Sequence, residues 1–258
     1  MIVDYHMHLR DPGERIAFTR KAIERFVETA ERRGVDEIGF TEHVYYFRQT
    51  AEIWDVPYQK ERCAYDLSEY CEAVLEAKER GLPVKLGLEV DYVGERQERL
   101  AELLAPYPFD FLLGSVHWLD GLAVDQRPGI WAGATVETVW MRYFSALAEL
   151  AGSRCVDVLA HPDLAKILGS RPAEPASYYP ELDGVALEIS TNGLYKPVGE
   201  LYPDPALLRG SPITLASDAH VPENVGRDFD RALALARDAG YETVTVFEGR
   251  VARQEPLG

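Results

Sequence analysis

The sequence predicts an α/β protein built on a parallel sheet, and three observations support that prediction. Short β-rich runs alternate with helical patterns along all 258 residues, which is typical of parallel strands joined by right-handed crossovers. A chain of this length with 47% hydrophobic residues suits one large domain of α/β-barrel size as well as two small ones. No linker, repeat or low-complexity segment interrupts the pattern, so we expect a single domain over residues 1–258.

The expected elements follow from apolar periodicity. Strand-like runs occupy residues 2–6, 36–42, 84–90, 109–117, 156–161, 184–190 and 212–217, with a further candidate at 243–248. Helical patterns occupy residues 18–33, 65–80, 95–104, 135–152 and 228–239. Gly34 and Gly81 follow the first two helical patterns, where a helix commonly ends. The Pro- and Tyr-rich segments 162–183 and 191–211 predict loops with short helices.

Composition narrows the class of function. The formal net charge is −16, and Lys and Arg are scattered among Asp and Glu, so we expect a small substrate rather than nucleic acid. No apolar run reaches the roughly 18 residues of a membrane span, and no basic, signal-like segment opens the chain. The three cysteines include no CxxC pair, which favours a reduced, cytoplasmic protein.

All six histidines lie at the end of a short apolar run or just after one. They are His6, His8, His43, His117, His161 and His220. Further polar residues follow the same runs, namely Glu42, Glu89, Asp91, Asn192 and Asp218. Because the active sites of parallel α/β folds lie at the carboxyl ends of the strands, we expect these side chains to converge. Imidazoles and carboxylates together indicate a shared metal site.

Spacing strengthens this interpretation, although single residues have simpler explanations. His6 and His8 are two residues apart, so they point to the same face of a strand. Glu89 lies within the apolar run KLGLEV, and a buried carboxylate is costly unless it is paired or bound to metal. Against this, a lone histidine such as His161 is often a hydrogen-bonded core residue, and Asp91 could merely cap the next helix. The ordered set is more specific than any member.

Seven motifs in order resemble the PHP family (polymerase and histidinol phosphatase), and in particular its histidinol-phosphatase type. The motifs are DYHMH, GFTEH, GLEVDY, LGSVH, DVLAHPDLAK, LEISTNGLYKP and ITLASDAH, and they span nearly the whole chain. The amidohydrolases also begin with an HxH, but they place a bridging lysine on strand four, whereas here a glutamate follows strand three. The resemblance implies a distorted, TIM-like (β/α)7 barrel. It also implies two to three divalent metal ions, of which the sequence leaves Zn, Fe and Mn open.

The resemblance also implies a ligand set. A first metal would be held by His6, His8, Glu89 and Asp218. Glu89 would bridge to a second metal that is completed by His117 and His161. His43 and His220 would hold a third. The family usually adds a histidine or aspartate shortly after the HxH, and in this chain Asp11 and Glu14 are the available residues.

The implied reaction is hydrolysis of a small phosphate ester, most specifically L-histidinol phosphate to L-histidinol and phosphate in histidine biosynthesis. Bound divalent ions lower the pKa of water and stabilise phosphoryl charge. Glu89, Asp218 and His220 are the expected catalytic residues, with His220 as one candidate acid. Lys166 and Lys196 would contact the phosphate. Expected substrate contacts, each of which could instead be ordinary turn or loop packing, are Asn192, Tyr45 and Trp118.

Two alternatives stay open. A nucleotide phosphatase or exonuclease of the same family is disfavoured because no basic stripe is visible. A non-catalytic metal-binding domain is disfavoured because eight motif ligands are retained. The connections after the fifth and sixth strands are short for the family, so part of the barrel wall is expected to be uncovered. The C-terminal tail or a second subunit could fill it, which makes a homo-oligomer conceivable.

Overall fold

Seven parallel strands form one sheet that curls into a barrel. The structure is a computed structural model that describes residues 1–9, 16 and 18–258. In spatial order the strands are β1 (Val3–Asp4), β2 (Glu37–Phe40), β3 (Val84–Asp91), β4 (Phe111–Ser115), β7 (Val158–Leu159), β8 (Ala186–Ser190) and β9 (Ile213–Ala216). Tyr5 N then donates to Leu215 O at 3.0 Å, which brings β1 against β9. The distorted (β/α)7 barrel expected from the sequence is thereby confirmed.

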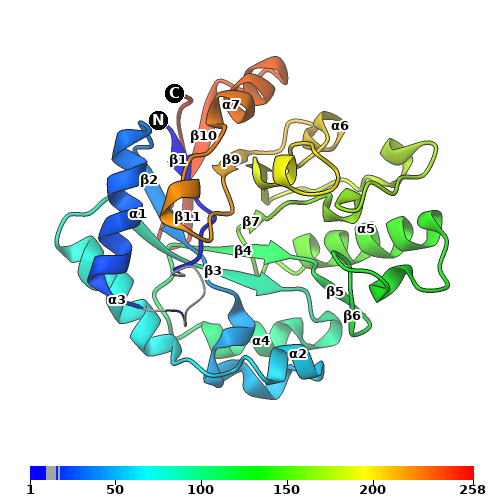
Figure 1. Cartoon of the computed structure of the whole chain (residues 1–258), viewed down its shortest axis with the longest axis horizontal. Helices are drawn as coiled ribbons and strands as arrows, with labels where there is room; N and C mark the ends of the chain where they lie inside the picture. The colour runs from blue at the N-terminus through cyan, green and yellow to red at the C-terminus, as the bar shows by residue number, and fades with distance from the viewer. Residues whose placement is uncertain (10–15, 17) are drawn as a thin grey trace.

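Helices surround the barrel, as Figure 1 shows. The longer ones are α1 (Arg20–Arg32), α3 (Leu67–Glu79), α4 (Gln97–Leu104), α5 (Val136–Gly152) and α7 (Phe229–Asp238), and they confirm the five expected helical patterns. Two single-turn helices, α2 (Pro57–Lys60) and α6 (Pro205–Leu208), lie in connections. Side chains of Thr19, Asp66 and Thr135 accept hydrogen bonds from the first turns of α1, α3 and α5, which fixes where these helices begin.

The barrel interior below the site is filled by aromatic rings. The Phe111 ring stacks on Tyr5 with centroids 4.9 Å apart and on Phe247 at 5.7 Å. A Cβ atom at Gly87 would lie 2.7 Å from the Phe111 ring, so the neighbouring strand needs a glycine there. All eight residues of β3 are buried, including the charged Lys85, Glu89 and Asp91.

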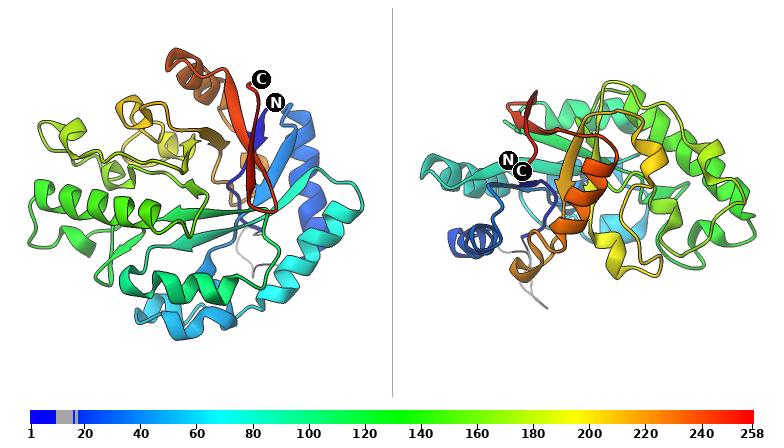
Figure 2. Two further views of the ribbon diagram at one scale, coloured as in Figure 1. Left: turned by 180° about the vertical axis from the view of Figure 1, so that it is seen from behind. Right: turned by 90° about the horizontal axis from the view of Figure 1, so that it is seen from above.

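The C-terminal tail closes the amino end of the barrel. The expected strand at 243–248 is β10 (Thr243–Glu248), and it pairs antiparallel with β11 (Val251–Pro256), a strand that the sequence analysis did not predict. This hairpin contacts the amino ends of β3, β4 and β7 through Glu248, Gly249 and Arg250. The two chain termini lie side by side, with Gly258 N donating to Met1 O at 3.1 Å (Figure 2). The tail thus covers the base of the barrel.

The connections after β7 and β8 contain short helices, as the sequence predicted. They include the 3-10 turns Leu164–Lys166 and Pro175–Tyr178, followed later by α6. Tyr179 packs its ring 5.1 Å from that of Phe144, so the first connection rests against α5. In this part of the chain no covering helix longer than one turn is formed.

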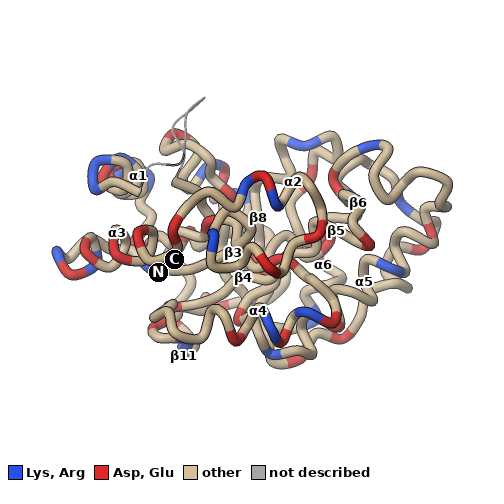
Figure 3. Tube along the Cα trace, turned by 90° about the horizontal axis from the view of Figure 1, so that it is seen from below, with Lys and Arg blue, Asp and Glu red and all other residues tan. Residues whose placement is uncertain are grey.

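The distribution of charged residues over the surface agrees with the mixed charge pattern of the sequence. Basic and acidic residues are interspersed along α1 and α5 (Figure 3). Among the described residues, no helix is both long and apolar enough to cross a membrane. The three cysteines are free thiols.

Candidate metal centre

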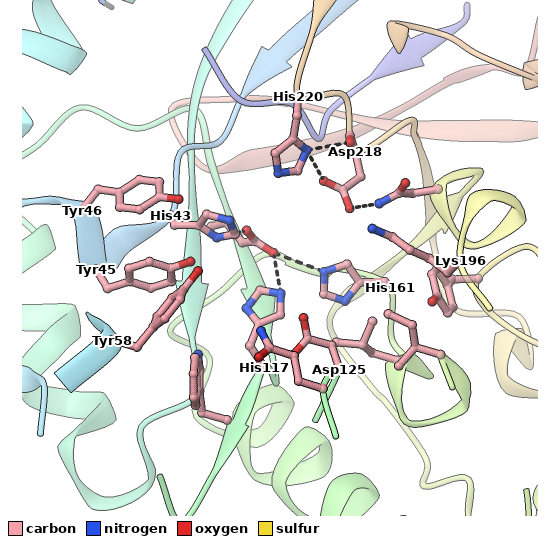
Figure 4. Close-up of a pocket in the computed structure, with 17 residues that line it drawn as sticks. His43, Tyr45, Tyr46, Tyr58, His117, Asp125, His161, Lys196, Asp218 and His220 are labelled. Carbon is pink, nitrogen blue, oxygen red and sulfur yellow. Dashed lines mark hydrogen bonds and ion pairs between the residues drawn. The ribbon is translucent and has the colours of Figure 1, made fainter. Parts of the chain in front are cut away.

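One buried carboxylate, Glu89, is the hub of the histidine cluster. Its oxygens lie within 4 Å of nitrogen atoms of five histidines, at 3.4 Å for His6, 3.8 Å for His8, 2.5 Å for His43, 3.4 Å for His117 and 3.2 Å for His161. The sixth histidine, His220, places Nδ1 3.5 Å from Asp218 Oδ1. Figure 4 shows His43, His117, His161, Asp218 and His220 converging from different strand ends. The expected convergence at the carboxyl end therefore occurs.

The backbone turns sharply where two of these residues leave their strands. His161, just past β7, has φ of +29°, and Asp218, just past β9, has φ of +49°. Non-glycine residues rarely adopt positive φ, and such conformations cluster at functional sites because surrounding structure must enforce them. Asp218 Oδ1 consequently lies 3.7 Å from His6 Nε2 and 3.5 Å from His8 Nε2. The turn after β9 thereby carries a carboxylate back to the first strand.

The mutual contacts within the cluster shift the pKa values of its members in different directions. Burial would raise the pKa of Glu89, but His43, His117 and His6 hold it well below its usual range. Burial lowers the pKa of His43 to about 4 despite the nearby Glu89 carboxylate. Burial would also lower the pKa of His117, but Glu89 and Asp91 raise it to about 9. Glu89 is thus ionised and His43 neutral near pH 7, the states in which both can be ligands.

Three further carboxylates lie beside the outer nitrogens of the histidine rings, and two of them are within hydrogen-bond distance. Glu188 Oε2 lies 2.8 Å from His6 Nδ1, and Asp91 Oδ1 lies 2.9 Å from His117 Nδ1. The third, Glu42, accepts from the backbone N–H of Leu9 at 2.5 Å, with its other oxygen 3.6 Å from His8 Nδ1. Carboxylates in this position fix the tautomer and aim the other nitrogen at the metal.

Two of these carboxylates depart from the sequence analysis. Asp91 was considered as a helix cap, and this is corrected, because its side chain is fully buried and bonded to His117. Glu188 was not singled out at all. The signal that identified Glu89 was also present there, because Glu188 lies inside the apolar run ALEIS on β8 and is fully buried.

The donor atoms fit divalent metal ions. Several buried cluster atoms have no hydrogen-bond partner, including His6 Nε2, His8 Nε2 and His161 Nδ1. Buried polar atoms without partners are rare in native proteins and call for an explanation such as an ion. Four overlapping triplets have all donor atoms within 4.8 Å of one another. They are His8, His43 and His220; His6, Glu89 and His161; His6, His8 and Asp218; and His43, Glu89 and His117.

The triplets contain the ligands that the family motifs imply, but they combine them differently. His43 lies with Glu89 and His117 as well as with His220, and His6 lies with His161. Imidazole and carboxylate donors in this arrangement suit Zn, Fe or Mn, as expected. Asp11 and Glu14, the two candidates for completing a third metal site, lie outside the described residues.

A cavity of about 200 Å³ opens beside the cluster. It brings together four of the five residues expected to contact substrate, namely Lys196, Asn192, Tyr45 and Trp118. Asn192 Nδ2 donates to Asp218 Oδ2, so this amide orients a cluster carboxylate. Tyr45 stacks on His43 with ring centroids 4.9 Å apart. Figure 4 shows the tyrosines Tyr45, Tyr46 and Tyr58 on one side of the histidines and Lys196 on the other.

Lys166 is placed elsewhere, which corrects its expected contact with phosphate. Its side chain is 2% exposed, and its ammonium donates to Asp163 Oδ2 at 2.7 Å and to Leu201 O at 2.8 Å. The ammonium also lies 5.3 Å from the centroid of the Tyr202 ring. The Lys166 ammonium pairs with the buried Asp163 carboxylate, and Lys166 is not among the residues that line the cavity.

An α/β barrel whose strand ends hold overlapping triplets of imidazoles and carboxylates belongs to the class of barrel proteins with a polynuclear metal centre. Residues 6–195 match the family described as the PHP domain. The chain therefore belongs to the PHP domain family.

Relatives extend this likeness over the whole chain. A protein of Deinococcus radiodurans named "Probable histidinol-phosphatase" is 30% identical over 259 residues, covering 95% of this chain and 96% of the relative. A protein of Clostridium acetobutylicum with the same name is 26% identical and covers 98% and 99%. The histidinol phosphate phosphatase of Lactococcus lactis, solved with Zn, L-histidinol and phosphate, is 22% identical. It has a TM-score of 0.70 and covers 98% of each chain, which shows a shared fold.

Proposed function

We propose that the protein is a metal-dependent phosphomonoesterase that hydrolyses L-histidinol phosphate to L-histidinol and inorganic phosphate. The observation that carries the proposal is the cavity in which the histidine cluster, one lysine and an aromatic wall face one another. The relatives named as histidinol-phosphatases over nearly the full chain support the choice of substrate. A cavity of about 200 Å³ suits a small ester.

Divalent ions, held by the five histidines that contact Glu89 together with Glu89 and Asp218, would lower the pKa of water and offset phosphoryl charge when bound. Binding of the phosphate and of the leaving group is the role of the chain's own side chains. Lys196 lines the cavity, and no carboxylate of the described residues lies within ion-pairing distance of its ammonium, so it can bind the phosphate as a point charge. Tyr45 and Trp118 form an apolar wall that can stack on an imidazole.

His220 is the histidine best placed to deliver a proton to the leaving alkoxide. Its side chain is 39% exposed, whereas that of Asp218 beside it is 12% exposed. His220 Nδ1 contacts Asp218 Oδ1 at 3.5 Å, and Asn192 holds the other oxygen of this carboxylate. The ring can therefore exchange its proton with solvent while Asp218 keeps it oriented.

Phosphate release from L-histidinol phosphate, measured with Mn, Zn and Fe, tests the proposal. We expect turnover that is abolished by chelation and restored by adding metal. Glu89→Gln should lower kcat/KM by about 10³-fold or more, since it removes the hub of the cluster. Glu79→Gln, on the exposed end of α3, is the matched control and should retain wild-type turnover.

Turnover of an aryl phosphate without turnover of L-histidinol phosphate would contradict the proposed substrate but would still support a phosphomonoesterase. Degradation of short single-stranded oligonucleotides at low enzyme concentration would favour the nuclease alternative. Metal binding without hydrolysis of any phosphate ester would contradict both.

A further inference from the structure

One carboxylate of the cavity wall, Asp125, takes no part in the histidine cluster. The cavity is lined by three carboxylates, and the other two, Glu89 and Asp218, contact histidine nitrogens within 4 Å. Asp125 belongs to none of the four ligand triplets. Among the described residues, no hydrogen bond or ion pair within 4 Å reaches its side chain. Asp125 is half-buried, and its carboxylate acts on His117 only through space, where it helps to raise the pKa of that imidazole.

The chain holds Asp125 at the cavity by a short ribbon that starts at a cluster histidine. Strands β5 (Trp118–Leu119) and β6 (Leu122–Ala123) pair antiparallel directly after His117. Val124 N then donates to His117 O at 2.9 Å, and Trp131 Nε1 donates to Val124 O at 2.8 Å. Asp125 follows this doubly bonded residue, and Figure 4 shows it beside His117. Its position is therefore set by backbone pairing.

The surroundings of Asp125 favour an organic cation. Trp118 of the same ribbon lines the cavity with Tyr58, and their ring centroids are 5.3 Å apart. Aromatic faces attract ammonium and imidazolium groups and stack on neutral imidazole. Lys196, at another part of the cavity wall, supplies the positive charge that a phosphate needs. The cavity therefore offers one anion-binding group, Lys196, and one cation-binding group, Asp125.

We propose that Asp125 is a specificity residue that binds the primary ammonium group carried by the leaving alcohol. This proposal rests on the proposed function and deepens it, because it assigns recognition of the positively charged end of the substrate. Asp125 would pair with the ammonium, Trp118 and Tyr58 would flank the ring, and Lys196 would hold the phosphate. The enzyme should then prefer phosphate esters that carry an ammonium over neutral esters of the same shape.

A comparison of two substrates tests this assignment. The substrates are L-histidinol phosphate and the imidazolylpropyl phosphate that lacks only the amino group. In Asp125→Asn we expect the ratio of their kcat/KM values to fall about 10- to 100-fold toward one, mainly through KM for the amine substrate. L-Histidinol without phosphate should bind Asp125→Asn more weakly by a similar factor in calorimetry. Metal content should equal that of the wild type.

The matched control is Asp120→Asn, in the turn of the same ribbon. Asp120 is exposed and pairs outward with Arg142, so this variant should keep the wild-type substrate ratio. Asp125→Glu, which keeps the charge, should retain part of the preference. An equal loss for both substrates, or a loss of bound metal, would overturn the assignment of Asp125.

Failure of the proposed function would look different. If the wild-type enzyme hydrolyses other phosphomonoesters but leaves L-histidinol phosphate intact, the substrate is wrong. Asp125 can then be tested with phosphoethanolamine against ethyl phosphate. A wild-type preference for the amine that Asp125→Asn abolishes would support the cation-binding role, and an unchanged ratio would refute it.

Discussion

The two ends of the barrel both bury charged side chains, but they satisfy them differently. At the amino end, buried Lys85 donates to Glu248 at 2.5 Å, and buried Asp110 accepts from Lys78, which also donates to Glu248 at 2.7 Å. At the carboxyl end, Glu89 meets five histidines, and several donor atoms there have no hydrogen-bond partner. Ion pairs complete the network at the base, whereas the network at the mouth is incomplete without cations from outside. The functional end of the barrel is therefore distinguished by polar atoms without hydrogen-bond partners, and not by the burial of charge itself.

Two lysines that follow strand-end motifs differ in the same way, because one is ion-paired within the protein and the other is not. Substitution of the ion-paired lysine should have the largest effect on stability. Lys166→Ala should destabilise the protein by about 3–5 kcal/mol, because the Asp163 carboxyl would be left buried without its cationic partner. Lys196→Ala should change the free energy of unfolding by less than about 0.5 kcal/mol, since its side chain is exposed. Urea denaturation of both variants measures the difference.

The kinetic outcome for the two lysines should be reversed. Lys196→Ala should raise KM for the phosphate ester, whereas folded Lys166→Ala should retain the wild-type KM. A stable Lys166→Ala protein with a raised KM would place Lys166 in the phosphate site and break the contrast.

Glu188→Gln changes a carboxylate that contacts the outer nitrogen of His6, one of the proposed metal ligands. We expect an effect of intermediate size, on metal affinity. The glutamine amide can donate to His6 Nδ1, which would force the ring proton onto Nε2, the atom that lies 3.4 Å from Glu89 and 3.7 Å from Asp218. Metal affinity should fall about 10- to 100-fold. Competition with a chelating dye measures this without relying on activity.

Glu181→Gln, exposed shortly before β8, is the matched control for Glu188→Gln and should bind metal as the wild type does. Unchanged metal affinity in Glu188→Gln would show that the buried carboxylate does not set the tautomer of His6.

Glu248→Gln probes the completed network at the base, where we expect the smallest effect. Hydrogen bonds from Lys78 and Lys85 lower the pKa of Glu248 to about 2, below the value of about 4.3 in an unfolded chain. The stabilisation is thus present above about pH 4 and is lost as the pH falls toward 2. It should be below about 1 kcal/mol, because the Glu248 side chain is 58% exposed.

Denaturation of wild type and Glu248→Gln at pH 7 and pH 3 measures the pH dependence. The difference in unfolding free energy between the two proteins should shrink at the lower pH. A difference that grows on acidification would contradict the assigned sign.

The amino-acid sequence alone was enough to predict the seven barrel strands, the five longer helices and the convergence of the six histidines with Glu89 and Asp218. These follow from local apolar periodicity and from the rule that parallel strands end at one face of the sheet. It could not distinguish Lys166 from Lys196, because both stand a few residues beyond a strand-end motif. Nor could it pair His6 with Glu188, which lies 182 residues away along the chain. Such contacts depend on how strands are staggered around the barrel and how each connection turns, so tertiary structure alone decided them.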